Sequence, residues 1–144
     1  MENRRMHQAW LALRLVFGVV PVVAGLDKFF NLLTNWEQYL NPLATRMLPI
    51  SDVAFMRVAG VIEIVAGLMV LTRWTRVGAY VVSAWLALIA VNLLMTGHYF
   101  DIAVRDVSLA VGAFALARLQ EVHSEAHHGV TEQMGRPIRS PAHV

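Results

Sequence analysis

Long apolar segments dominate the chain and alternate with short polar stretches. Four segments contain the roughly 20 mostly apolar residues that a helix needs to cross a bilayer; they comprise residues 9–33, 53–71, 77–96 and 102–119. Residues 34–52 form a long connection, whereas the later connections, 72–76 and 97–101, are short. Short connections join antiparallel neighbours. The pattern therefore predicts an all-α membrane protein, folded as an antiparallel bundle of four transmembrane helices.

The composition favours the same fold class. Of the 144 residues, 57% are hydrophobic and 15% are charged, whereas soluble domains carry about 25% charged residues. A soluble bundle of this size would need a mostly polar exterior, so the lipid bilayer is the expected partner. Basic residues are scattered among the apolar runs and form no stripe, which excludes a nucleic-acid surface.

The first apolar segment has an alternative interpretation as a cleaved signal peptide, because Arg4 and Arg5 precede it. Its length, the presence of Arg14 within it and the absence of an Ala-x-Ala site before Asp27 favour a membrane helix instead.

Basic residues cluster at one end of the predicted helices, which sets the expected orientation. Arginines 4, 5, 73, 76 and 118, and 136 and 139 beyond them, lie on one side, against Arg46 alone in the opposite loops. The positive-inside rule places residues 1–8 and the polar tail, 120–144, in the cytoplasm. Loop 34–52 then faces outward, with Trp36 and Tyr39 suited to the interface. We expect the tail to have little structure beyond a short helical start.

Ionisable side chains inside the predicted helices are the main functional candidates, because each costs about 2.5–3.5 kcal/mol at the bilayer centre. At a rise of 1.5 Å per residue, most lie about 6–9 Å below the outer helix ends and Glu63 about 15 Å below. We expect them to form one charge-paired polar cluster in the outer half of the bundle, with Glu63 beneath it and Asn92 nearby. The other members of this cluster are Asp27, Lys28, Arg57, Arg105 and Asp106.

Two interpretations of this cluster remain open. Buried ion pairs can fix helix register without any further role, or the side chains can form a quinone or proton site. Glu63, the deepest carboxylate, favours the second interpretation, since burial suits a proton-handling group unless an arginine partner keeps it ionised.

Glycines mark the expected contact faces of the helices. Small residues let helices approach closely, and those of the first helix recur on one stripe at helical spacing. The glycines predicted to pack helices are Gly18, Gly25, Gly60, Gly67 and Gly112.

Histidines lie only in the termini and turns, so the spans offer no axial haem ligand. Any redox role would use a diffusible carrier such as quinone, or a cofactor of another subunit. His123, His127 and His128 have metal-compatible spacing, but no carboxylate or cysteine completes a zinc pattern. A solvated tail is the favoured interpretation, and no metal is expected.

Two segments resemble the DoxX-like family of small four-helix bacterial membrane proteins. One is Arg14-x3-Gly18-x6-Gly25-x2-Lys28, and the other is Ala-Gly-Val-Ile-Glu-Ile-Val-Ala-Gly-Leu at residues 59–68, which includes Glu63. The resemblance spans about residues 11–119. It implies a four-helix bundle in the bacterial inner membrane and an association with redox chemistry, because one branch resembles the small subunit of thiosulfate:quinone oxidoreductase.

The leading hypothesis is an accessory or anchoring subunit of a membrane electron-transfer complex, with protein partners and with quinone near the polar cluster. The chain is not expected to catalyse a reaction alone, because it has no nucleotide motif and no nucleophile with an adjacent base. Two alternatives stand beside it. One is a small solute or proton-coupled transporter that uses Glu63, and the other is a purely structural membrane protein.

Overall fold

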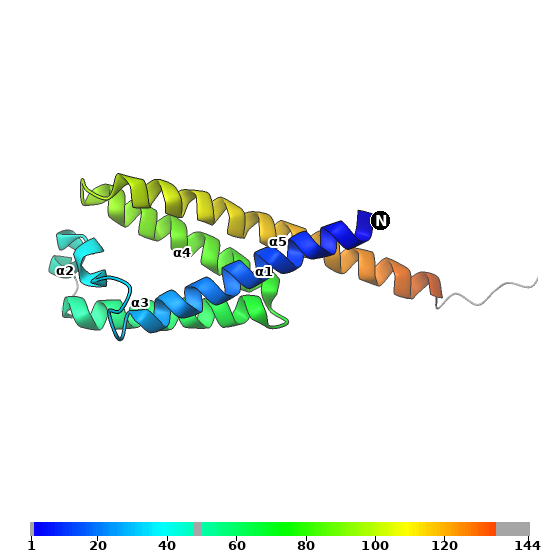
Figure 1. Ribbon diagram of the computed structural model, residues 1–144, viewed down its shortest axis with the longest axis horizontal. Helices are drawn as coiled ribbons and strands as arrows, with labels where there is room; N and C mark the ends of the chain where they lie inside the picture. The colour runs from blue at the N-terminus through cyan, green and yellow to red at the C-terminus, as the bar shows by residue number, and fades with distance from the viewer. Residues whose placement is uncertain (1, 48–49, 135–144) are drawn as a thin grey trace, which may run out of the picture.

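The computed structural model describes residues 2–47 and 50–134, which fold into four long helices that run alternately up and down (Figure 1). These are α1 (Glu2–Asp27), α3 (Asp52–Leu71), α4 (Thr75–Met95) and α5 (Phe100–Met134). The loop between α1 and α3 carries a 3-10 helix, η1 (Trp36–Tyr39), and the short helix α2 (Pro42–Met47). Neither described range contains a strand. The predicted all-α bundle of four transmembrane helices is confirmed.

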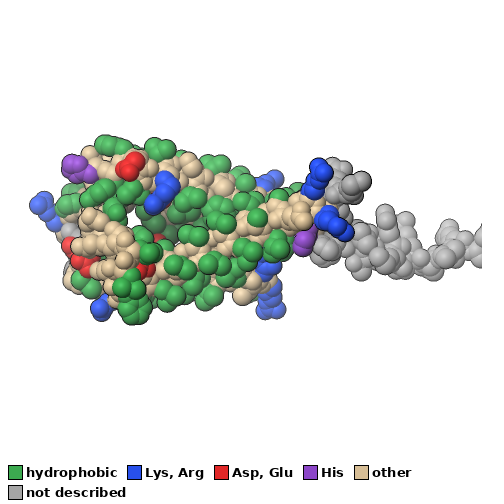
Figure 2. All heavy atoms as spheres, in the orientation of Figure 1, with side chains coloured by type: hydrophobic (Ala, Val, Ile, Leu, Met, Phe, Trp, Pro, Cys, Tyr) green, Lys and Arg blue, Asp and Glu red, His purple; other side chains and the backbone are tan. Residues whose placement is uncertain are grey.

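The flanks of the bundle are apolar, as lipid requires. By length and composition α1, α3 and α4 can each cross a membrane. Helix α5 carries more charge, but it packs along α4 and exposes Val104, Val111 and Phe114 on its outer side. It therefore crosses the same layer. Figure 2 shows hydrophobic side chains along the flanks, with most of the charged side chains toward the two ends.

The four helices form two closely packed pairs, α1 with α3 and α4 with α5. Gly25 and Gly60 face each other across the first pair. A Cβ added to Gly25 would lie 2.5 Å from the carbonyl oxygen of Gly60, and a Cβ on Gly60 would lie 2.6 Å from that of Gly25. A Cβ added to Gly67 would likewise lie 2.5 Å from the carbonyl oxygen of Gly18. Larger residues at these positions would push the two backbones apart.

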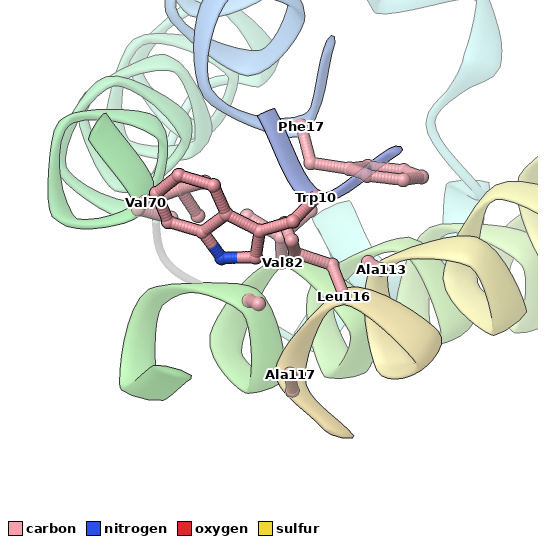
Figure 3. Close-up of a cluster of buried hydrophobic side chains, with 9 residues drawn as sticks. Trp10, Phe17, Val70, Val82, Ala113, Leu116 and Ala117 are labelled. Atoms are coloured by element: carbon pink, nitrogen blue, oxygen red, sulfur yellow. The ribbon is translucent and has the colours of Figure 1, made fainter. Parts of the chain in front are cut away.

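The two pairs meet at one end of the bundle, which we call the arginine end and which holds the start of α1 and the α3–α4 turn. Buried apolar side chains from all four long helices fill this half (Figure 3); among them are Trp10, Phe17, Val70, Val82 and Leu116. The opposite end, here the loop end, holds η1, α2 and the α4–α5 turn.

Arg14 ties α1 to α3 at the arginine end. Its guanidinium donates hydrogen bonds to the carbonyl oxygens of Val70, Leu71 and Thr72, at 3.0, 2.6 and 2.7 Å. These are terminal carbonyl groups of α3, which lack partners within the helix and carry its partial negative charge. Arg14 therefore acts as a cap supplied by a neighbouring helix.

Helix α1 ends at Asp27, six residues before the predicted boundary at residue 33. Asn31 adopts a left-handed conformation with φ of 52°, and its N–H donates to the carbonyl oxygen of Asp27 at 2.7 Å. Asparagine is one of the few non-glycine residues that end helices in this way. Because the residues after Asn31 are apolar, the hydropathy pattern placed the end of the helix too late.

Helix α5 continues to Met134, well beyond the predicted boundary at residue 119 and beyond the expected short helical start of the tail. Contacts with α1 support the first turn of this extension. The indole N–H of Trp10 donates to the side-chain oxygen of Gln120 at 2.7 Å, and the ring of His123 stacks on that of Trp10 with centroids 4.7 Å apart.

Candidate functional site

A cavity of about 660 Å³ lies between the two helix pairs in the loop half of the bundle. Its volume falls within the range of roughly 300–1,000 Å³ that is usual for small-molecule sites. Its floor is the apolar cluster of the arginine half, through Phe17, Ala66 and Val82. Figure 2 shows the surface hollowed between the helix pairs near the loop end. Most lining residues are apolar, and the charged ones are Lys28, Glu63, Arg105 and Asp106.

A buried ion pair between α1 and α3 forms one wall of the cavity. Lys28, just after the last turn of α1, places its Nζ 2.6 Å from Oε2 of Glu63, and the two side chains are only 6% and 7% exposed. The indole N–H of Trp85, from α4, donates to Oε1 of Glu63 at 3.2 Å. The ring of Trp36, from η1, covers the Lys28 ammonium at 3.6 Å. Four elements thus converge on this pair.

The hydrogen bonds of the pair determine what it offers to a ligand. Each oxygen of Glu63 already accepts one hydrogen bond, and the adjacent ammonium stabilises its charge. Lys28 has three N–H donors, of which Glu63 takes one and the Trp36 ring shields another side. The wall therefore offers the cavity a positively charged donor.

A second ion pair, on α5, lines the same cavity. Arg105 Nε and Nη2 both lie 2.9 Å from Oδ1 of Asp106. The Asp106 side chain is 5% exposed and that of Arg105 is 61% exposed, so the carboxylate points inward and the guanidinium lies at the rim. The two cations of the cavity are thus balanced by two carboxylates.

Asp27 positions the loop that covers the cavity. Its carboxylate accepts hydrogen bonds from the backbone N–H groups of Leu32 and Leu33, at 3.0 to 3.2 Å. It also accepts one from the indole N–H of Trp36 at 2.7 Å. Asp27 therefore holds Trp36 over Lys28 and does not itself line the cavity.

Asn92 fastens the same loop to α4. Its side-chain amide donates to the carbonyl oxygen of Tyr39 at 2.8 Å, and its oxygen accepts the N–H of Asn41 at 3.2 Å. Asn92 also lines the cavity, although both polar atoms of its amide are engaged with the loop.

Arg57 does not join the predicted cluster, and this part of the prediction is wrong. Its side chain is exposed, does not line the cavity and makes no ion pair within the described residues. Depth alone suggested the contact, but Phe55, Met56 and Ala59 are the residues of α3 that line the cavity at this level. Arg57 lies about 100° around the helix from Met56.

Sequence reasoning missed two residues of the site. Trp85 was not singled out, although a tryptophan within a predicted span needs a partner for its N–H when it is buried. Trp36 was expected to anchor in the membrane interface, whereas its ring covers Lys28.

The histidines near the arginine end form ring contacts. His123 stacks on Trp10, and His7 lies 5.4 Å from both rings. Among the described residues, no group of three or more potential ligands could hold a metal ion. The side chains of His127 and His128 lie outside the described part.

Comparisons with known proteins identify the family. No curated protein and no solved structure matched the chain. The family model described as DoxX matches residues 9–97, which include Lys28, Glu63 and Trp85 but not α5. This match covers more than half of the 144 residues. The chain is therefore a membrane protein that belongs to the DoxX family.

Proposed function

We propose that the chain is an accessory membrane subunit of a quinone-linked electron-transfer complex, and that its cavity binds the quinone headgroup beside Lys28. The observation that carries this proposal is the cavity itself, which is mostly apolar, lies in the loop half of the bundle and contains a buried ammonium donor. A lipid-soluble ligand with a polar head matches this combination.

The charge balance of the cavity favours a neutral ligand. Lys28 is paired with Glu63, and Arg105 with Asp106, so an anionic ligand would have to compete with a resident carboxylate. A quinone headgroup is neutral and carries carbonyl oxygens that accept hydrogen bonds. Lys28 and Arg105 are the residues that would donate to it. Quinone supplies two-electron transfer coupled to proton transfer when it is bound.

The same proposal assigns the orientation and the partners. Arg76 and Arg118 both bind Glu121, at 2.9 and 2.7 Å, which places these arginines together at the arginine end. The positive-inside rule supports a cytoplasmic location for this end in a bacterial inner membrane. The cavity then lies in the outer half of the bilayer. The electrons come from protein partners in the complex.

The transporter hypothesis has less support from the geometry. Glu63 is held by Lys28 and Trp85. The arginine half beneath it is filled by the apolar cluster around Trp10 and Phe17, so no polar route continues from Glu63 toward that end among the described residues.

A binding experiment with the full chain in lipid nanodiscs tests the proposal. The probe is a radiolabelled benzoquinone with a ten-carbon tail, measured by scintillation proximity. We expect saturable binding that weakens about 10-fold, or about 1.4 kcal/mol, in the double variant Lys28→Met/Glu63→Met. This variant removes the donor while keeping the charges balanced. Arg57→Met is the matched control and should bind like the wild type.

Two results would contradict the proposal. The first is the absence of saturable binding to the wild-type chain. The second is unchanged binding in the double variant. If that variant alters only abundance or assembly, the ion pair has the purely structural role considered above.

A further inference from the structure

The seam between α1 and α5 is closed toward the arginine end. Phe17 packs directly on Gly112, where an added Cβ would lie 2.7 Å from the Phe17 ring. Nearer the end, the hydrogen bond from Trp10 to Gln120 joins the same two helices. Over their whole length, however, α1 contacts α5 far less than it contacts α3.

Toward the loop end, the same seam is open. Val20 of α1 lines the cavity, yet it is 54% exposed, and Val16, beside Phe17 at the edge of the seal, also lines it and is 48% exposed. Arg105 of α5 also lines the cavity and is exposed. Residues that line a cavity and also face the outside mark its opening. Between Arg105 and the seal at Gly112, the opening extends about 10 Å along α5, at 1.5 Å per residue.

We infer that this seam is the lateral portal through which an amphipathic quinone enters, and through which its apolar tail extends into the lipid leaflet on the loop side. The inference rests on the proposed function. A cavity of about 660 Å³ can enclose a headgroup but not a long prenyl or alkyl tail. Each methylene transferred out of water gains about 0.8 kcal/mol, so the tail stays among the acyl chains.

The other exits from the cavity are less suitable. At the loop end, Leu33 lines the cavity and is 68% exposed, but Trp36 and Tyr39 also cover the cavity there, and Asn92 holds their loop in place. On the α3–α4 side, Leu88 lines the cavity and is 58% exposed. These two helices are joined by a short turn and pack on each other more extensively than α1 and α5 do. Leu88 therefore marks the competing route.

Arg105 suits the rim of a portal for a ligand with a polar head. Its guanidinium has five N–H donors, of which Asp106 takes two. The others can bind a carbonyl oxygen as the headgroup passes a lipid-facing seam, while the bound Asp106 neutralises the charge. The alkyl stem of arginine packs against apolar surface.

Bulky substitutions at the portal test the inference in nanodiscs. Val20→Trp should weaken binding of the ten-carbon-tailed benzoquinone at least 10-fold. It should leave binding of a tail-less tetramethyl benzoquinone within about two-fold. Val19→Trp is the matched control, because Val19 is 45% exposed on the same helix but does not line the cavity. Val16→Trp repeats the test one turn away if Val20→Trp fails to fold.

The outcomes separate the portal from the proposed function. If the wild type binds neither quinone, the proposed function fails and the portal fails with it. If the wild type binds the tailed quinone and Val20→Trp does so equally well, only the portal is overturned. Weakening by Leu88→Trp without weakening by Val20→Trp would move the exit to the α3–α4 side. Equal loss of both probes in Val20→Trp and in Val16→Trp would also overturn the portal, because the tail would then have no contact at this seam that is separate from the headgroup site.

Discussion

Removal of Lys28 alone should destabilise the bundle more than removal of both members of its ion pair. At the 2.6 Å separation of Nζ and Oε2, the attraction is about 6 kcal/mol for an effective dielectric constant of about 20. Taking the two ions out of water costs several kcal/mol each, so the pair as a whole contributes little net stability. A single substitution removes the attraction but leaves the other charge buried.

We therefore expect Lys28→Met to lower the free energy of unfolding by about 3–5 kcal/mol. Glu63→Gln should lower it less, because the Trp36 ring still stabilises the ammonium by about 2 kcal/mol. The double variant Lys28→Met/Glu63→Met should fall within about 1 kcal/mol of the wild type, since two flexible apolar side chains then replace the pair.

Unfolding of the detergent-solubilised chain by increasing fractions of sodium dodecyl sulfate, followed by far-ultraviolet circular dichroism, measures these differences. Arg57→Met is the control, because Arg57 is exposed and belongs to no ion pair within the described residues; it should change stability by less than about 0.5 kcal/mol. If the single substitutions at Lys28 and Glu63 changed the free energy of unfolding as little as this control does, the reasoning would be refuted. The pair would then not be shielded from water.

Three further changes probe the contacts that shape the site. Gly25→Ala should lower the free energy of unfolding by about 1–3 kcal/mol, because its Cβ would overlap the carbonyl oxygen of Gly60. Denaturant titration measures this loss, and a variant as stable as the wild type would contradict the close approach of the two helices. Arg14→Met should remove about 2–4 kcal/mol by leaving terminal carbonyl groups of α3 without their charged donor, and hydrogen exchange should rise at the α3–α4 turn and not at the loop end. Asn92→Leu should increase proteolysis of the loop around Tyr39 while lowering global stability by only about 1–2 kcal/mol; an unchanged cleavage rate would show that other contacts hold the loop.

Sequence reasoning predicts the helices and the polar layer because both follow from periodicity and from a constant rise per residue. Lys28 and Asp106 were placed at similar depth, and both line the cavity. Depth does not determine which way a side chain points. Arg57 was assigned to the same layer for this reason and faces outward instead.

The pairing partners could not be predicted, because they depend on helix rotation and on the loop. Glu63 was expected to be free or to pair with an arginine, but it pairs with Lys28 through the close contact of Gly25 with Gly60. Trp36 reaches Lys28 only because the chain turns at Asn31. A single left-handed residue within an apolar run does not change the hydropathy pattern, so hydropathy could not predict this turn.

The two helix pairs share their apolar cluster at the arginine end, so a tilt of one pair against the other would turn about that end. Within each pair the helices are fastened, by the glycine contacts in one and by the hydrogen bond from Ser83 to the carbonyl oxygen of Ala110 in the other, at 2.8 Å. Trp10 lies at the arginine end, and Lys28 lies about 27 Å from it along α1, 18 residues away at 1.5 Å each. A tilt of about 5° between the pairs would displace Lys28 by about 2 Å over that length. A small tilt at the arginine end would thereby be magnified at the loop end, where the hydrogen bonds of Asn92 to the loop and of Trp85 to Glu63 limit how far the two pairs can separate.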